Sequence, residues 1–448
     1  MKVSRPRARF QWLPVLGLVS GISLVALGVV VLRWREPAGH APRPTDPTTE
    51  RLRALGYVGY VHDDPDPERD GVMLHDPARA QSGINVYCSA HGTEVSFVDM
   101  QGSILHRLVI PAPDDDKADC LLEPYDAASF LGLNAPRLTR LDWNSSRLWV
   151  SSDGHHHDVA VDAEGRVYTL SALRSWLAHD SRRLPVQDHT VTVLNRDGRV
   201  ERTIPLLPLF ADRIPAERLA RMVELLAELR SSSPEYHQAS DVLHPNTIEL
   251  LARDLPVAPA GSALLCVREL DLVAIVDLQA ERLLWTWGPG VLERPHHPSL
   301  LDDGTLLVFD NGTTRGFSRV IQLDPATRRI LWQYEGDPPE TFFSDVRGSA
   351  QALQNGNVLV TESMRGRVFE VTRAGDVVWE FLNPERGPTG ERKQIYRMFR
   401  ISAAQFAEWK QRGQATGQAR NASGHPTSSP DPPRSSGEGE RVGSDDPG

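Results

Sequence analysis

The feature of this sequence that most constrains its fold is a repeat of about 47 residues. Three segments end on tryptophan in the same context, AIVDLQAERLLW at Trp285, VIQLDPATRRILW at Trp332 and VFEVTRAGDVVW at Trp379, so the tryptophans lie 47 residues apart. Each segment has the pattern of two short β-strands joined by a turn. Weaker copies of this closing hairpin end at three earlier positions: Leu108, Trp149 and Ile204.

A second pattern precedes the closing hairpins. A short β pattern leads into a glycine turn and then a β-branched strand in three places: HPSLLDDGTLLV from His297, SAQALQNGNVLV from Ser349 and HDVAVDAEGRVY from His157. Such turns are typical of tight β-hairpins. Four short strands in a period near 47 residues are typical of a β-propeller blade. The six closings therefore predict an all-β, six-bladed β-propeller over residues 83–400, in which the final aromatic residue of each copy packs between blades.

The gap between the closings at Ile204 and Trp285 predicts a helical insertion at about residues 213–232. Residues 214–230 have a helical pattern, and Pro215 suits the first turn of such a helix. Its apolar residues recur at helical spacing on one face: Leu219, Met222, Val223, Leu226 and Leu229. We expect this face to pack against the propeller rather than to bind a partner.

The N-terminus has the pattern of a membrane anchor. Residues 12–32 form an uncharged stretch of 21 residues, preceded by four basic residues and followed by Arg33 and Arg35. At about 1.5 Å per residue such a helix spans about 30 Å, the thickness of a bilayer core. The basic flank places the N-terminus in the cytoplasm. We expect residues 1–35 to be the cytoplasmic end and a transmembrane signal anchor of the inner membrane, with a cleaved signal peptide as the alternative.

The remaining segments lie outside the repeats. Residues 36–82 read as a proline-rich linker and a lead-in to the propeller. Residues 401–412 predict a short helix, capped by Ser402 and stopped at Gly413. The tail over residues 413–448 has almost no apolar residue and is expected to be disordered.

Composition and missing motifs exclude several classes of function. The net charge is −10, which argues against nucleic acid as the main partner. The sequence contains no P-loop and no dinucleotide-binding glycine motif, so a nucleotide cofactor or donor has no support. Only three cysteines are present, with no Cys-x-x-Cys pair for a structural zinc site. We expect neither a metal nor another cofactor.

Candidate chemistry lies where the innermost strand of each blade begins, because equivalent positions of successive blades converge on the central channel. The residues at these starts are mainly imidazoles and one arginine: His155, His156, His157, His244, His296, His297 and Arg347. Such groups, without a cluster of carboxylates, suit an oxyanion such as sulfate or phosphate. A neutral imidazole is also a nucleophile. A metal site is the competing interpretation, but no helical His-x-x-x-His pair supports it.

Residues 241–384 resemble the bacterial arylsulfotransferases, which are six-bladed propellers in or facing the periplasm. The matching elements occur in the family's order: Asp-x-x-His-x-Asn at Asp241, His244 and Asn246; an arginine near the end of the following strand at Arg268; and a histidine, His296 or His297, before VFDNG at Val308. The closing DVVWEFLNP is also similar to the family's sequences.

The resemblance implies a nucleotide-independent transfer of a sulfuryl group from a phenolic sulfate ester to a phenol, by way of a sulfated histidine. The nucleophile maps onto His296 or His297; counting back from the hairpin glycine favours His296, and a one-residue change in the loop would make it His297. His244 and Arg268 map onto groups that bind the sulfuryl oxygens and assist the leaving oxygen. Asn246, His157 and Arg347 are further candidates for substrate binding.

The sequence also departs from the family. Arg347 is followed by Gly348 and Ser349 where the preceding blade has two histidines, and Glu362 stands in the position of Asp310. The family's closely spaced disulfide has no counterpart, although Cys88 and Cys120 can pair in an oxidising compartment and leave Cys266 buried on a central strand.

Two other classes of function stay open. One is a non-catalytic propeller that binds a ligand or an envelope partner. The other is a quinoprotein dehydrogenase, which the absence of a vicinal cysteine pair disfavours.

Overall fold

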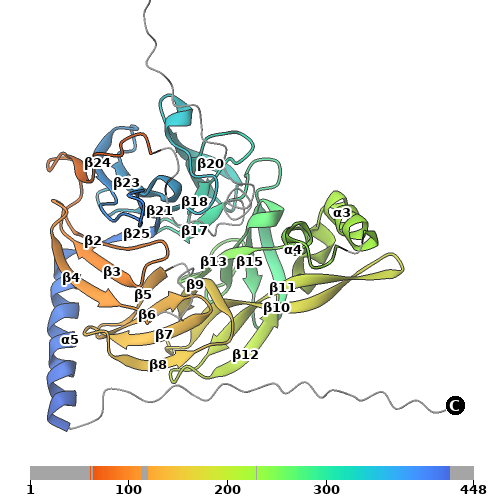
Figure 1. Ribbon diagram of the computed structural model, residues 1–448, viewed down its shortest axis with the longest axis horizontal. Coiled ribbons are helices and arrows are strands. Elements are labelled where there is room, and N and C mark those ends of the chain that lie inside the picture. The colour runs from red at the N-terminus through yellow and green to blue at the C-terminus, as the bar shows by residue number, and fades with distance from the viewer. Residues whose placement is uncertain (1–60, 62–63, 112–119, 229, 424–448) are drawn as a thin grey trace, which may run out of the picture. The chain divides into compact units, whose positions relative to one another are not determined.

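The chain forms a ring of six antiparallel sheets, as predicted, in a computed structural model that describes residues 61, 64–111, 120–228 and 230–423 (Figure 1). Each sheet is one blade of a β-propeller. The first strands of successive blades contact one another in a closed circle, β5 to β9, β13, β17, β21, β25 and back to β5, so they are the innermost strands.

The strands of each blade are given from the centre of the ring outward. Blade 1 contains β25 (Ile395–Ile401), β2 (Ile84–Ser89), β3 (Glu94–Val98) and β4 (Ile104–Val109). Blade 2 contains β5 (Cys120–Asp126), β6 (Ser129–Asn134), β7 (Arg137–Asp142) and β8 (Arg147–Ser151). Blade 3 contains β9 (His155–Val161), β10 (Val167–His179), β11 (Arg182–Leu194) and β12 (Val200–Pro205).

The other three blades follow in chain order. Blade 4 contains β13 (Pro245–Leu250), β14 (Ala263–Val267), β15 (Leu272–Asp277) and β16 (Arg282–Trp287). Blade 5 contains β17 (His296–Leu300), β18 (Leu306–Asp310), β19 (Arg319–Asp324) and β20 (Arg329–Glu335). Blade 6 contains β21 (Ser349–Ala352), β22 (Val358–Glu362), β23 (Arg367–Val371) and β24 (Val377–Leu382). Short 3-10 helices span Ala211–Arg213, Arg268–Leu270, Pro339–Thr341 and Ser363–Arg365.

The ring is closed by strands from both parts of the chain. β25, near the C-terminus, pairs with β2 and supplies the innermost strand of blade 1. β1 (Gly71–His75) pairs with β24 and adds a fifth, outermost strand to blade 6. The expected lead-in over residues 36–82 therefore contributes a strand, and the strand that completes the ring runs to Ile401, where the sequence predicted a helix to begin.

The blade-closing tryptophans lie between blades, as the repeat predicted. Each indole Nε1 donates a hydrogen bond to a backbone carbonyl in the next blade, at 3.0–3.1 Å. The pairs are Trp149 with Arg196, Trp285 with Pro325, Trp332 with Arg373 and Trp379 with Met100. Trp285 and Trp379 are buried, and a buried indole needs such a partner for its N–H group, so these contacts help to fix how neighbouring blades meet.

The replacement of Asp310 by Glu362 in the next blade keeps a structural ion pair. Each carboxylate is fully buried at the end of the second strand and contacts the arginine that opens the third strand. The Asp310–Arg319 distance is 2.7 Å and the Glu362–Arg367 distance is 2.9 Å. The difference between Asp310 and Glu362 therefore leaves the same ion pair in both blades.

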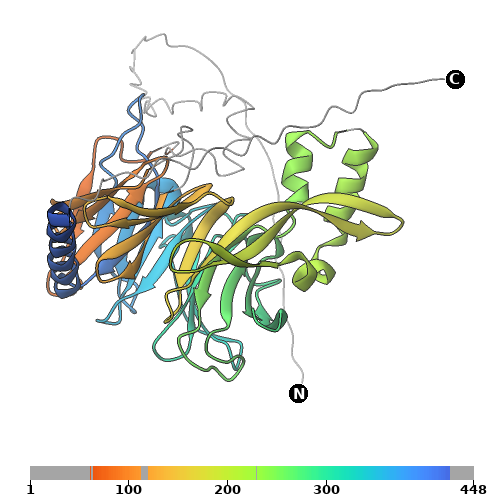
Figure 2. The ribbon, with the colours of Figure 1, turned by 90° about the horizontal axis from the view of Figure 1, so that it is seen from below.

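Blade 3 differs from the others because its middle strands are long. β10 and β11 pair over 13 residues each and extend beyond the ring as an arm (Figures 1 and 2). The insertion that follows holds α2 (Leu207–Phe210), α3 (Ala216–Ala227) and α4 (Pro234–Ser240), so it is longer than predicted. Met222 and Leu225 of α3 are buried in the same core as Leu184 of the arm. The apolar face of the helix therefore packs on the propeller, as expected.

The C-terminal helix is longer than the sequence predicted. α5 spans Ala403–Ser423, and Ser402 Oγ accepts a hydrogen bond from Gln405 N at 3.1 Å, as an N-cap does. The helix passes through Gly413 instead of ending there, so residues 413–423 are helical. A Cβ atom at Gly413 would lie 2.1 Å from Cβ of Trp143. Glycine is thus needed at this position for close packing against blade 2.

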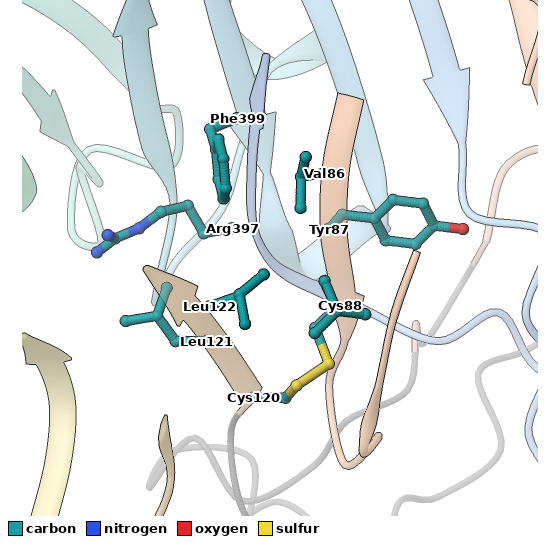
Figure 3. A pocket seen from close by; sticks show the side chains of 9 residues that line it. Val86, Tyr87, Cys88, Cys120, Leu121, Leu122, Arg397 and Phe399 are labelled. Atoms are coloured by element: carbon teal, nitrogen blue, oxygen red, sulfur yellow. A yellow bond between two sulfur atoms is a disulfide. The ribbon is translucent and has the colours of Figure 1, made fainter. Parts of the chain in front are cut away.

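A disulfide joins Cys88 of β2 to Cys120 of β5 and so links blades 1 and 2, while Cys266 is free and buried. Both predictions about the cysteines are confirmed. The cavity beside the disulfide has a volume of about 10 Å³ and apolar walls that include Leu121 and Leu122 (Figure 3). This is about the least space that can hold one water molecule, so the cavity is too small for a substrate.

We expect the Cys88→Ser/Cys120→Ser variant to lose about 3–4 kcal/mol in the free energy of unfolding, because the bond closes a loop between residues 32 apart. The urea midpoint of the oxidised protein would measure this loss. A reducing agent should shift the midpoint of the wild type toward that of the variant and leave the variant unchanged. Equal midpoints for the oxidised wild type and the variant would contradict the prediction.

The predicted anchor at residues 12–32 and the tail beyond residue 423 lie outside the described residues. Within the described part of the chain, none of the helices combines the length and apolar character that a bilayer crossing requires.

Candidate active site

Most of the predicted site residues meet at one place in the channel. The rings of His157 and His244 lie 4.7 Å apart, and those of His156 and His157 lie 4.8 Å apart. The charge of Arg268 acts on His157, His244 and His296. His155 does not join them: it is fully buried and contacts Ser171 in its own blade and Ser151 at the end of β8 in blade 2. The channel register of the repeats thus brings together side chains from blades 3, 4 and 5.

Backbone strain marks the same positions. Four non-glycine residues have a left-handed backbone conformation where an innermost strand begins or bulges: His157 (φ 64°), His244 (φ 45°), His297 (φ 46°) and Arg347 (φ 59°). This conformation costs about 1–3 kcal/mol for such residues. Bulges break the ladder beside three of them, in β9, β13 and β17. The strained residues therefore lie at the same level of the ring, where each innermost strand begins or bulges.

His296 is held in one tautomer by its surroundings. Its Nδ1 lies 2.7 Å from Oδ1 of Asn311 and 3.1 Å from the carbonyl of Arg294, two acceptors, so Nδ1 carries the proton. The Asn311 amide cannot be reversed, because its Nδ2 donates to the carbonyls of Ser344 and Arg347. The backbone N–H of Arg347 points at Nε2 from 3.3 Å. Nε2 of His296 is therefore unprotonated, and its lone pair accepts this long hydrogen bond from Arg347.

The ring of His296 is also neutral. Burial, and then the charge of Arg268, lower its pKa to about 3. A neutral imidazole with one unprotonated ring nitrogen is the form in which histidine acts as a nucleophile.

His297 has a different environment. Its backbone N–H donates to Oγ1 of Thr247 at 3.0 Å, and its Nδ1 is buried without a hydrogen-bond partner among the described residues. Burial, and then the charge of Arg397, lower its pKa, while a hydrogen bond to the backbone of Ala350 opposes the shift. Of the two candidate histidines, His296 is the one with an assigned tautomer, and it is the one whose pKa the charge of Arg268 lowers.

His244 is oriented by a carboxylate. Its Nδ1 donates a short hydrogen bond to Oδ2 of Asp241, the residue that ends α4. Oδ1 of Asp241 accepts from Nε2 of His189, on β11, at 2.8 Å. His189 was not among the predicted residues, since it lies in the middle of a long strand and not at the start of a blade.

Arg268 is fixed by Glu269. Its Nε and Nη2 donate to Oε1 of Glu269 at 3.0 and 2.8 Å, whereas its Nη1 has no hydrogen-bond partner in the described part of the protein. Glu269 also contacts Arg294 and, from helix α3, Arg218. Burial would raise the pKa of Glu269, but the charges of these arginines outweigh it and lower the pKa to about 2. Three cations around one carboxylate leave a net positive charge, which suits an oxyanion.

The three residues predicted to bind substrate lie around this centre in different roles. Asn246 is buried, and its amide donates to the carbonyl of Pro295 at 2.9 Å, directly before His296. Arg347 is buried and donates from Nη1 to Oε1 of Gln394 at 2.5 Å. His157 packs against the rings of His156 and His244. The structure thus places His157 among the site imidazoles, whereas the side chain of Asn246 contacts the backbone before His296 and that of Arg347 contacts the side chain of Gln394.

A second group of charges lies in the channel and was not predicted. Arg397, on β25, forms ion pairs at 3.1 Å with both Glu123 and Asp158. Burial raises the pKa of Glu123 and of Glu249 to about 7. Each of these carboxylates lies on an innermost strand, so their positions in the repeats could have indicated that they face the channel. The group could be predicted in full only if β25, which carries Arg397, were recognised as a strand of the ring. Among the described residues, no three His, Cys, Asp or Glu side chains gather in an arrangement that would hold a metal ion.

The buried neutral histidines predict a loss of stability in mild acid. Burial lowers the pKa of His155 to about 4 and that of His296 to about 3, from an ordinary value of 6.5. Between these values the unfolded chain binds more protons than the folded one, so stability is complete above pH 6.5 and falls as the pH decreases. Each histidine contributes about 2 kcal/mol of this loss between pH 6.5 and 5.

Urea unfolding at pH 7 and pH 5 measures this effect. His155→Gln keeps groups that can bond to both serines but removes one titrating ring outside the site. This variant should lose about 2 kcal/mol less than the wild type between the two pH values. A pH dependence that is the same in both proteins would contradict the assignment.

Comparison with known proteins gives one family match. The sequence profile of the arylsulfotransferase (ASST) family matches residues 137–384, which include every residue of the site that meets at His244 and His296. None of the curated protein sequences matches the chain significantly.

Solved structures with a similar fold share little sequence with this chain. A Bacteroides caccae protein of unknown function is 12% identical, with a TM-score of 0.48 over 72% of this chain and 99% of its own. A streptogramin B lyase is 13% identical, with a TM-score of 0.41 over 77% and 97%. AztD from Citrobacter koseri in its apo form is 9% identical, with a TM-score of 0.39 over 72% and 98%. These likenesses are too distant to indicate a function.

Proposed function

Since the chain belongs to the arylsulfotransferase family, we propose that it moves a sulfuryl group from a phenolic sulfate ester to a phenol through a sulfated His296. The observation that carries this proposal is the state of His296, which is neutral, holds its proton on Nδ1 and uses the Nε2 lone pair only for a 3.3 Å hydrogen bond from the backbone N–H of Arg347, within reach of the charge of Arg268. A nucleophile of this kind divides one difficult transfer into two easier steps.

In the first step, Nε2 of His296 attacks the sulfur atom of the donor. A nitrogen–sulfur bond forms, the sulfur–oxygen bond to the aryl group breaks, and the phenolate leaves with the electron pair. Nδ1 keeps its proton, and Oδ1 of Asn311 stabilises the positive charge that develops on the ring. Asn311 is a residue that the sequence did not single out for this role.

In the second step, the oxygen of an acceptor phenol attacks the sulfur atom and the nitrogen–sulfur bond breaks. The lone pair returns to Nε2 of His296. The phenolic proton passes to a base, and Nε2 of His244 is the candidate, because Asp241 occupies the other ring nitrogen. No nucleotide is needed, since the donor ester supplies the sulfuryl group.

Arg268 is the group that would bind the sulfuryl oxygens. Glu269 fixes one side of its guanidinium group, and Nη1 on the other side can bind a ligand. A cation that is positioned before the reaction stabilises charge without reorganisation, which is usually the largest electrostatic contribution to such a transfer.

Mass spectrometry after incubation with an aryl sulfate tests the proposal. In the absence of acceptor, the peptide that contains His296 should gain the mass of one SO3 group, and a phenol should remove it. A chain with no adduct and no turnover over a panel of aryl sulfates would instead favour the alternative, a propeller that only binds a ligand or an envelope partner.

We also propose that the propeller faces the periplasm, tethered by residues 12–32 to the inner membrane. The disulfide between Cys88 and Cys120 supports an oxidising compartment, because such bonds rarely persist in the cytosol. Protease added to spheroplasts should degrade the propeller if it lies on the periplasmic side, and protection from the protease would contradict this location.

A further inference from the structure

A chain of four polar side chains leads from blade 3 into the site. His156 Nε2 lies 3.2 Å from His189 Nδ1, and His189 Nε2 lies 2.8 Å from Oδ1 of Asp241. Oδ2 of Asp241 bonds to Nδ1 of His244. The residues come from β9, β11, the end of α4 and the residue before β13, so two blades and the insertion must be in place for the chain of bonds to exist.

The protons in this chain have one consistent direction. Burial would raise the pKa of Asp241, but the charge of His244 and the hydrogen bonds from both histidines outweigh it, so the carboxylate is ionised and accepts on both oxygens. His244 then donates from Nδ1 and His189 from Nε2. Nδ1 of His189 is left with a lone pair and accepts the proton of His156 Nε2. Nδ1 of His156 is consequently unprotonated, and it is indeed buried without a hydrogen-bond partner among the described residues.

We propose that Asp241 and His189 are positioning residues that let His244 take a proton from one phenol and return it to another. This inference rests on the proposed function. In the acceptor step, Nε2 of His244 takes the phenolic proton as the new sulfur–oxygen bond forms. In the next donor step, the same proton moves to the leaving phenolate oxygen as its bond to sulfur breaks. The imidazolium exists between the two steps, and the Asp241 carboxylate balances its charge.

The other charges near His244 explain why a carboxylate is needed there. The groups that face this ring are Asp241, His157, His189, Arg268, Glu269 and, across the channel, His296. Burial and the charge of Arg268 oppose protonation of His244, whereas Asp241 and the more distant Glu269 favour it. Without Asp241, a proton on His244 would face Arg268 with little compensation.

The role of His189 is to fix the carboxylate. An Asp241 side chain bonded only to His244 would be free to turn, whereas the second bond from His189 sets the plane of both oxygens. Helix α3 fixes the backbone of the same residue, because Nη1 of Arg218 donates to the carbonyl of Asp241 at 2.8 Å. The insertion thus contributes directly to the geometry of the site.

The test compares Asp241→Asn and His189→Gln with the wild type on aryl sulfates whose leaving phenols range from strongly acidic to weakly acidic. A strongly acidic phenol leaves without a proton, so we expect less than a fivefold loss with 4-nitrophenyl sulfate as the donor in single-turnover sulfation. With a weakly acidic leaving phenol, which needs the proton, Asp241→Asn should lose about 10²-fold, in the range of general acid–base catalysis. His189→Gln should lose about tenfold. In the Asp241→Asn variant, the pH profile of kcat should no longer show the ionisation of His244.

A purely structural role predicts a different result. Damage to the fold would lower the rate with every donor by the same factor, and that outcome would overturn the proposal, as would an unchanged rate with the weakly acidic leaving phenol. His237→Gln, an exposed histidine on α4, is the matched control and should leave all rates unchanged. Thermal unfolding of each variant checks that the comparison is made between folded proteins.

A measurement without turnover separates this inference from the proposed function. Nitrogen-15 NMR of the histidine rings should show His244 protonated at Nδ1 in the wild type and a mixture of tautomers in Asp241→Asn. The same tautomer in both proteins would overturn the positioning role even if transfer occurs. A wild type that transfers no sulfuryl group from any donor would overturn the proposed function and the proton-holding role, while the NMR result would still report whether Asp241 orients His244.

Discussion

A His296→Asn variant should lose about 10⁴-fold or more in the rate of sulfuryl transfer, because it removes the atom that we propose forms the covalent intermediate. The expected loss applies to kcat with every donor, including donors with a good leaving group, since no leaving group replaces a missing nucleophile. The bonds from Nδ2 of Asn311 to the carbonyls of Ser344 and Arg347 do not involve the imidazole and should remain in place. Steady-state kinetics with an aryl sulfate and a phenol would measure the effect, and the sulfated peptide should disappear in the same variant.

His297→Asn is the matched control for this experiment. The residue has a left-handed backbone with φ of 46°, a conformation that asparagine tolerates better than most residues. We expect the rate to stay within about fivefold of the wild type, because His297 faces Arg397 and not Arg268. If His297→Asn abolished transfer and His296→Asn did not, the assignment of the nucleophile would be reversed.

Arg268→Gln should lower kcat by about 10³-fold, at the upper end of what one positioned donor contributes to an oxyanion-binding site. The charge on the sulfuryl oxygens is greatest as the bonds to sulfur change, so KM should change much less than kcat. Arg268→Lys keeps the charge but cannot form the two bonds that Nε and Nη2 make to Glu269. We expect it to recover about tenfold of the lost rate.

The remaining arginines make this test specific. In Arg268→Gln, Glu269 stays paired with Arg218 and Arg294, so its charge is not left buried alone. The urea midpoint should therefore change little. A kcat equal to that of the wild type would show that Arg268 is only a structural partner of Glu269.

The blades could be predicted from the sequence because each one is a local unit. A hairpin turn, two strands and a closing aromatic residue recur within about 47 residues, and the closings at Leu108, Trp149 and Ile204 also lie in outermost strands. The channel positions of His244, Arg268 and His296 follow from the same register. The contacts within a blade join residues that are close in the sequence, so a sequence pattern can predict them.

The parts that escaped prediction depend on distant pairing or on local irregularity. β25 pairs with β2 across more than three hundred residues, so its seven residues have no repeat of their own, and Arg397 was missed with it. A bulge between His296 and Ser299 adds a residue to β17, so counting from the hairpin glycine could not separate His296 from His297. His189 was missed because the long hairpin of blade 3 carries it into the site from a strand that is not innermost.

Because β25 closes the ring, blade 1 can be completed only late in the synthesis of the chain. β3 ends at Val98 and β25 at Ile401, so at 5–20 residues per second about 15–60 s of synthesis separate the two halves of blade 1. During this interval β2 has one edge without its partner, and the carboxylates of Glu123 and Asp158 lack the arginine that neutralises them. In an incomplete chain the ring is therefore open at blade 1, and the channel carboxylates have no arginine to pair with. We expect sulfuryl transfer to begin only after β25 has been synthesised.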